Sequence, residues 1–68
     1  MIARNRDDVA EIGRRAKTNK RTVIHLHRED GTLFGVRTLH RTDPGYTDFV
    51  LSFAKENNLT IEEWSNTP

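Results

Sequence analysis

The chain of 68 residues contains no cysteine, which excludes a disulfide framework, a thiol nucleophile and a cysteine-based zinc site. No apolar run approaches the roughly 20 residues that a membrane-spanning helix requires. The N-terminal stretch also lacks the apolar core of a signal peptide. There is no phosphate-cradling glycine loop, no serine elbow and no paired-carboxylate site. We therefore expect a cytoplasmic protein that is not an enzyme and uses no cofactor.

Hydrophobic residues make up 34% of the chain and charged residues 31%, a composition typical of a polar globular protein. No repeat, linker or low-complexity segment divides it, so we expect one domain over residues 1–68 with a single small core. Residues 64–68 are expected to form a frayed tail. A chain of this length without cross-links is marginally stable. We expect it to gain stability from homodimerisation or from a bound partner.

A β-hairpin is expected over residues 22–39, where an Asp-Gly pair at 30–31 separates two runs of strand-forming residues. Two turn types compete. A two-residue loop would pair Glu29 with Thr32. A turn with Gly31 in the left-handed conformation, which forms a β-bulge, would instead pair Arg28 with Thr32. A shift of one residue exchanges the two faces of a strand, so the better core selects the register.

The bulged turn gives the better core, and it also explains the glycine, because a positive φ is cheap for that residue alone. The expected buried face of the hairpin then consists of Ile24, Leu26, Phe34 and Val36, with Thr22 and Thr38 at its rim. The opposite face holds Val23, His25, His27, Leu33, Gly35, Arg37 and Leu39.

Two amphipathic helices are expected beside the hairpin. The first covers residues 6–17, with Asn5 as its N-cap. Its apolar stripe consists of Val9, Ile12, Gly13 and Ala16. The second has Asp43 as its N-cap, begins at Pro44 and runs to about residue 56. Its expected core stripe consists of Tyr46, Phe49, Val50 and Phe53.

With a last strand over residues 59–64, these elements predict an α+β fold of order α-β-β-α-β. A right-handed crossover places the last strand beside the first strand of the hairpin. The sheet is then three-stranded and antiparallel, in the order 2-1-3, with two helices on one face. The other face stays open. Its expected residues are Val23, His25, His27, Leu33, Arg37, Leu39, Glu62 and Trp64.

This open face predicts a contact surface. Trp and Arg are the side chains that most often anchor protein interfaces, and apolar residues gathered on one exposed face usually mark a binding site. We therefore expect a small non-catalytic regulatory protein that binds a protein partner through this face and the edge of the hairpin. The expected protein-binding residues are His25, His27, Leu33, Arg37, Leu39 and Trp64.

The spacing of His25 and His27 on one strand face suits zinc, but such a site needs a third ligand. His40 has the wrong parity on its strand, and Glu62 would have to reach across from another strand. We therefore expect no metal site. The two histidines with Arg37 could also serve as acid, base and phosphate clamp, so a small RNase is the third hypothesis for function.

Charge is distributed unevenly, although the net charge is only +1. Residues 1–22 contain seven Lys and Arg against three acids, and residues 43–68 contain one Lys against five acids. The basic cluster makes nucleic-acid binding, to DNA or RNA, the alternative function. Its expected residues are Arg14, Arg15, Lys17, Lys20, Arg21 and Arg37. No aromatic residue that could stack on bases is interleaved with the cluster.

The small helix-and-sheet layout resembles that of bacteriophage-encoded inhibitors that bind a host enzyme, and this resemblance implies protein binding. The order of hairpin and then helix also resembles the sheet DNA-binding domains of integrases, which implies contact with DNA. Both are resemblances of architecture and transfer no site residue to this chain.

Overall fold

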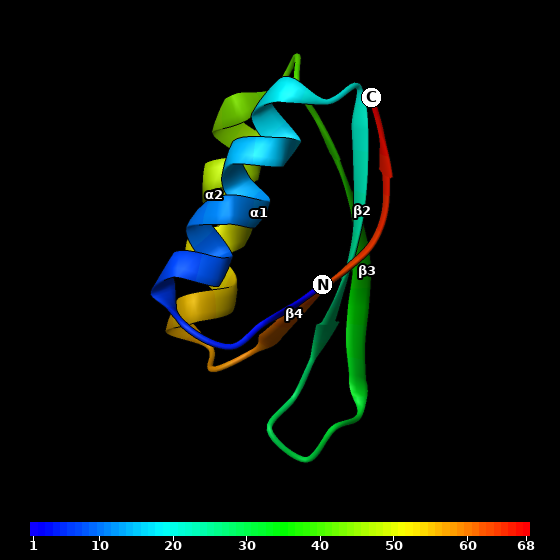
Figure 1. Cartoon of the computed structure of the whole chain (residues 1–68). Coiled ribbons are helices and arrows are strands. Elements are labelled where there is room, and N and C mark those ends of the chain that lie inside the picture. The colour runs from blue at the N-terminus through cyan, green and yellow to red at the C-terminus, as the bar shows by residue number, and fades with distance from the viewer.

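The computed structural model describes all residues from 1 to 68. Its elements along the chain are β1 (Ile2–Ala3), α1 (Arg6–Thr18), β2 (Arg21–His27), β3 (Leu33–His40), α2 (Pro44–Glu56) and β4 (Thr60–Thr67). Both helices pack on the same face of one sheet, and the turn between β2 and β3 projects beyond them (Figure 1). Neither helix is long and apolar enough to cross a membrane.

The sheet has four antiparallel strands in the order β1-β4-β2-β3. The α+β class is confirmed, but the expectation of three strands is wrong. The three expected strands keep their neighbours, and β1 adds to the edge at β4 by pairing Ile2 with Glu62 and Ala3 with Ile61. A run of two residues is too short for an alternating pattern, so β1 leaves no recognisable signal in the sequence.

Side chains cap both helices at the expected positions. The Asn5 Oδ1 atom accepts a hydrogen bond from the Asp8 N–H at 2.9 Å. The Asp43 Oδ1 atom accepts one from the Tyr46 N–H at 3.2 Å. In both cases a polar side chain satisfies an N–H that has no partner inside the helix. The two helices therefore begin where the sequence predicts.

The core lies between the helices and the sheet. It consists of Ala3, Ile12, Ala16, Ile24, Leu26, Leu39, Val50, Ala54 and Ile61. The expected stripe of α1 is confirmed, since Ile12, Gly13 and Ala16 are buried and Val9 packs against them. Gly13 allows the two helices to approach closely, because a Cβ atom there would lie 3.0 Å from Leu51 Cδ1.

Helix α2 turns a different face to the core than the aromatic pattern predicts. Its buried residues are Thr47, Val50 and Ala54, whereas Phe49 is 65% exposed. The expected aromatic core stripe is therefore wrong apart from Val50. The small side chains at 47 and 54 let α2 lie close to its neighbours. The aromatic residues flank the core instead, and Phe53 contacts Phe34 of β3, with ring centroids 5.8 Å apart.

The hairpin turn has the expected form. The Arg28 N–H donates to the Thr32 carbonyl at 2.8 Å, and the Gly31 N–H donates to the Arg28 carbonyl at 2.9 Å. Gly31 adopts a φ of 87°, which costs little for glycine. The Asp30 carboxylate accepts hydrogen bonds from the Thr32 hydroxyl and N–H, at 2.6 and 2.9 Å. These bonds hold the pKa of Asp30 below its ordinary value, and the bond from the Thr32 hydroxyl has the largest effect.

A second bulge in β3 changes the register beyond the turn. Leu26 pairs with Gly35 and His27 pairs with Leu33, so Phe34 is an extra residue with no partner on β2. Each residue of β3 beyond this point is therefore shifted by one position relative to the expected pairing.

The shift exchanges the two faces of β3. Leu39 is fully buried beneath the helices, and Val36 is 44% exposed on the opposite face. The expectation that Val36 is buried and Leu39 open is therefore wrong. Strand β2 has the expected faces, with Ile24 and Leu26 buried against the helices.

The expected frayed tail is also wrong, because β4 continues to Thr67. Residues 65–67 pair with residues 21–23 of β2. The Asn19 side-chain amide donates to the Asn66 side-chain oxygen, which ties the end of the chain to the end of α1. Residues 64–67 are thus part of strand β4, and only Pro68 lies beyond it.

Candidate functional site

The face of the sheet turned away from both helices is the candidate site (Figure 1). We call it the open face, and its residues are Ile2, Arg21, Val23, His25, His27, Leu33, Val36, Thr38, His40, Thr60, Glu62, Trp64, Ser65 and Thr67. Large apolar side chains on it are exposed to solvent: Trp64 by 65%, Leu33 by 49%, Val36 by 44% and Ile2 by 43%. Of the expected protein-binding residues, His25, His27, Leu33 and Trp64 lie here.

A bulge in β4 places Trp64 over this face. The pairing of β4 with β2 passes from Glu63 to Ser65, so Trp64 is an extra residue. Its indole stacks on the imidazole of His25, with ring centroids 4.7 Å apart and an angle of 10° between the planes. The stack restricts the rotamers of both rings, although most of the indole remains in contact with water.

Two histidines and a carboxylate lie together beside this stack. Glu62 is directly opposite His25 on the neighbouring strand. The Glu62 Oε1 atom is 3.1 Å from the His27 Nε2 atom. All three side chains are half-buried. Glu62 belongs to a different strand from the two histidines, as the sequence predicts, and the pairing of β4 with β2 brings its carboxylate beside them.

Two of the expected protein-binding residues do not lie on the open face. Leu39 is buried in the core. Arg37 lies on the side of β3 that faces the helices, stretched over Gly35, where its Nη1 atom donates to the Val36 carbonyl at 2.9 Å. The bulge at Phe34 causes both changes. Gly35 is the sequence feature that could have indicated this bulge, because glycine inside a strand often marks one.

The sequence pattern does not predict two of the apolar residues that the open face contains. Val36 is missed because of the second bulge, and Ile2 because β1 is too short to predict. Both are exposed apolar side chains that flank the cluster of histidines and glutamate, since Val36 is opposite His25 and Ile2 is opposite Glu62.

The expected nucleic-acid-binding residues do not form a free basic surface. Three of them pair with carboxylates: Arg14 with Glu11 at 2.6 Å, Arg15 with Glu63 at 2.5 Å and Lys17 with Asp48 at 2.7 Å. The hydrogen bond from Arg14 also lowers the pKa of Glu11. Lys20 and Arg21 form no ion pair. Arg37 lies on the helix-facing side of the edge strand.

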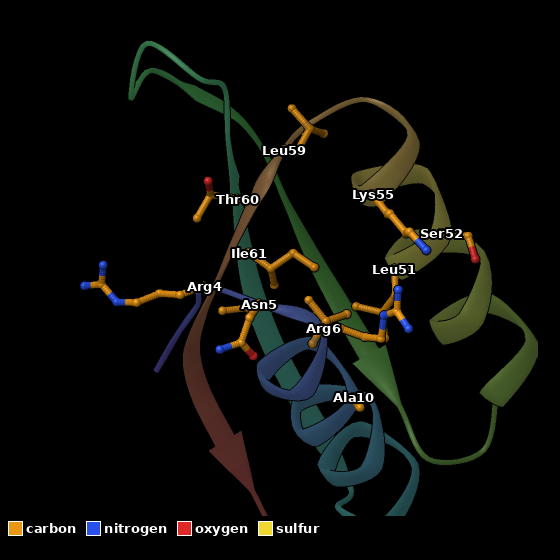
Figure 2. A pocket seen from close by; sticks show the side chains of 12 residues that line it. Arg4, Asn5, Arg6, Ala10, Leu51, Ser52, Lys55, Leu59, Thr60 and Ile61 are labelled. Atoms are coloured by element: carbon orange, nitrogen blue, oxygen red, sulfur yellow. The ribbon is translucent and has the colours of Figure 1, made fainter.

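A cavity of about 510 Å³ lies between the start of α1, the end of α2 and β4. Figure 2 shows its lining residues, with Arg4 extending away from the others. Its apolar residues include Val9 and Leu51, and its titratable groups are the three cations Arg4, Arg6 and Lys55. The cavity therefore offers no pair of acid and base for catalysis.

Comparison of the chain with protein-family models, with curated proteins and with solved structures gives no match. We therefore infer its function from the chemistry of the open face.

Proposed function

We propose that the chain is a small non-catalytic regulatory module, of the inhibitor or adaptor type, that binds a partner protein through its open face. The observation that supports this most is the exposure of four large apolar side chains on one uncovered face: Ile2, Leu33, Val36 and Trp64. Exposed apolar side chains gathered in this way usually mark an interaction site. The free edge at β3 adjoins this face and offers backbone groups to a partner strand.

The pattern of the outward positions supports the same proposal. An antiparallel sheet with one solvated face normally places polar side chains toward water. In β2 and β3 three outward positions hold valine or leucine instead, namely Val23, Leu33 and Val36. Trp64 offers the largest contact area, and its stack on His25 limits the side-chain entropy that binding would remove.

The partner that fits best is a protein with an apolar surface fringed by carboxylates. Arg21 and His40 are opposite each other at one end of the same face, and neither forms an ion pair. Glu62, the one acid among the open-face residues, already contacts His27. The open face of a second copy would thus bring no free carboxylate to Arg21, so a different protein is the better complement.

Nucleic-acid binding is the weaker candidate. Arg14, Arg15 and Lys17 already pair with carboxylates, so new contacts with phosphates would have to replace those pairs. The RNase hypothesis is weaker for a similar reason, since Arg37 does not share a face with His25. A gel shift with mixed DNA and RNA at low salt separates these alternatives from protein binding.

The test is affinity capture from the source cell with three baits: the wild type, Trp64→Ala and Phe49→Ala. Trp64 and Phe49 are equally exposed, at 65% each, but Phe49 belongs to α2 in the other layer. The captured protein is identified by mass spectrometry, purified, and titrated by calorimetry against each variant. We expect Trp64→Ala to weaken binding by about 2 kcal/mol or more, roughly 30-fold, and Phe49→Ala to leave it unchanged.

Two results would overturn the proposal. One is an affinity that Trp64→Ala does not change, or that Phe49→Ala weakens as much. The other is capture of the chain by itself alone, with a dimer in sedimentation equilibrium, which would identify the open face as a homodimer interface.

A further inference from the structure

Three side chains that can bind metal ions come together on the open face from two neighbouring strands. His25 and His27 are two residues apart on β2, so they share a face, and Glu62 of β4 is opposite His25. One nitrogen from each histidine and one oxygen from the glutamate all lie within 4.8 Å of one another. Because all three residues belong to paired strands, the sheet itself holds them beside one another.

The spacing is close to that which a small divalent ion imposes. Bonds of about 2.0–2.2 Å to zinc would put the ligand atoms of a tetrahedral site roughly 3.3–3.6 Å apart. His27 Nε2 and Glu62 Oε1 are 3.1 Å apart already. Since all three ligand atoms lie within 4.8 Å of one another and the paired strands hold the Cα atoms in place, closure around an ion requires movement of side chains only.

The ligand types select the class of ion. Two imidazole nitrogens and one carboxylate oxygen suit Zn²⁺, Ni²⁺, Co²⁺ and Cu²⁺, whereas Mg²⁺ and Ca²⁺ prefer oxygen ligands alone. We propose that His25, His27 and Glu62 form a three-ligand site for a divalent transition-metal ion, zinc above all, with water in the fourth position. The site needs no partner protein, because all three ligands belong to the free chain.

The surroundings of the three ligands favour binding. Each of them is half-buried, and Trp64 stacks on His25, so little rotamer freedom remains to be lost when an ion binds. Glu62 contributes the negative charge that attracts the ion, and no cation forms an ion pair with it other than His27 in its protonated form. The positions that flank the site on β1 and β3, Ile2 and Val36, are uncharged.

The test is calorimetric titration of ZnCl₂ into the untagged chain after treatment with a chelator. We expect one ion to bind per chain in the wild type. His27→Ala and Glu62→Gln each remove one ligand from a solvent-facing position, and each should weaken zinc binding about tenfold or more. The matched control is His40→Ala, which removes the third histidine of the chain from an exposed position outside the cluster. It should leave zinc binding unchanged.

Trp64 provides a second readout. It is the single tryptophan of the chain and contacts one of the proposed ligands. Ni²⁺ or Cu²⁺ bound at His25 should quench its fluorescence at one equivalent in the wild type and not in Glu62→Gln, with circular dichroism confirming that the variant is folded.

Three results would overturn the proposed site. The wild type could fail to bind zinc at millimolar concentration, or Glu62→Gln could bind zinc as tightly as the wild type. A decrease in zinc affinity in His40→Ala as large as that in His27→Ala would show that zinc binds unspecifically to surface imidazoles. A failed metal site would leave the Trp64→Ala comparison with the partner protein unaffected, so the two proposals can be rejected separately.

Discussion

The indole of Trp64 lies almost parallel to the imidazole of His25, with the ring centroids 4.7 Å apart. The two side chains come from different strands, and the bulge in β4 brings the indole over the histidine. The largest exposed apolar side chain of the open face therefore lies beside the three proposed metal ligands. The proposed protein contact and the proposed metal site share His25, and both depend on the pairing of β2 with β4.

Removing Trp64 should affect binding far more than folding. Because its side chain is 65% exposed, Trp64→Ala loses mainly the stack on His25, worth about 1 kcal/mol. Urea unfolding followed by circular dichroism should show a similarly small decrease in the free energy of unfolding for Phe49→Ala, because Phe49 is equally exposed. A loss of several kcal/mol in Trp64→Ala alone would instead identify Trp64 as a residue that the fold requires.

The faces of the hairpin could be predicted from the sequence as far as its second bulge. Asp30 and Gly31 define the turn, and the alternation of β2 turns Ile24 inward and His25 outward. The faces of β3 depend on a second bulge at Phe34, and a bulge in one strand is set by how it pairs with the other. Local sequence patterns therefore describe β2 correctly and β3 incorrectly.

The candidate site, like the hairpin, could be predicted only in part from the sequence. His25 and His27 lie on one strand, so their common face follows from alternation alone. The position of Glu62 depends on which residue of β2 it meets, and pairing between residues so distant in sequence leaves no local pattern. Helix α2 shows a similar limit, because the burial of Thr47 in place of Phe49 results from the packing of both helices on the sheet.

The positive φ of Gly31 predicts a cost for any residue with a Cβ atom. Gly31→Ala should lower the free energy of unfolding by about 1 kcal/mol, purely through the backbone, because a Cβ atom there would meet nothing within 4 Å. Gly45→Ala is the matched control. Gly45 lies in the first turn of α2, where a Cβ atom would make an ordinary contact at 3.9 Å, so alanine should be neutral or stabilising by up to about 1 kcal/mol. Equal unfolding midpoints in urea for the two variants would contradict the proposed strain.

The buried hydroxyl of Thr47 predicts a stabilising substitution. Thr47 is fully buried, and its Oγ1 atom has no hydrogen-bond partner. Thr47→Val keeps the shape of the side chain and removes the unpaired polar atom, so it should stabilise the fold by about 1 kcal/mol in urea unfolding. Thr47→Ser keeps the hydroxyl and loses the methyl group, and it should destabilise the fold by a similar amount. A valine variant less stable than the wild type would mean that the hydroxyl is satisfied in solution.

The hydrogen bonds from Thr32 to Asp30 predict that the hairpin turn weakens in acid. These bonds favour the charged carboxylate, so the pKa of Asp30 is lower in the folded chain than in the unfolded chain. Its contribution to stability is therefore complete above the ordinary aspartate pKa of about 3.9, and it is lost as the pH falls through the lower folded-state value. Urea midpoints measured from about pH 6 to about pH 2.5 should show Asp30→Ala below the wild type at the upper end, with a gap that narrows toward the lower end. Glu29→Ala removes the neighbouring acid of the same turn, whose side chain forms no ion pair, and should leave the midpoint nearly unchanged throughout. A gap between Asp30→Ala and the wild type that stays constant across this range would show that the ionised carboxylate is not what stabilises the turn.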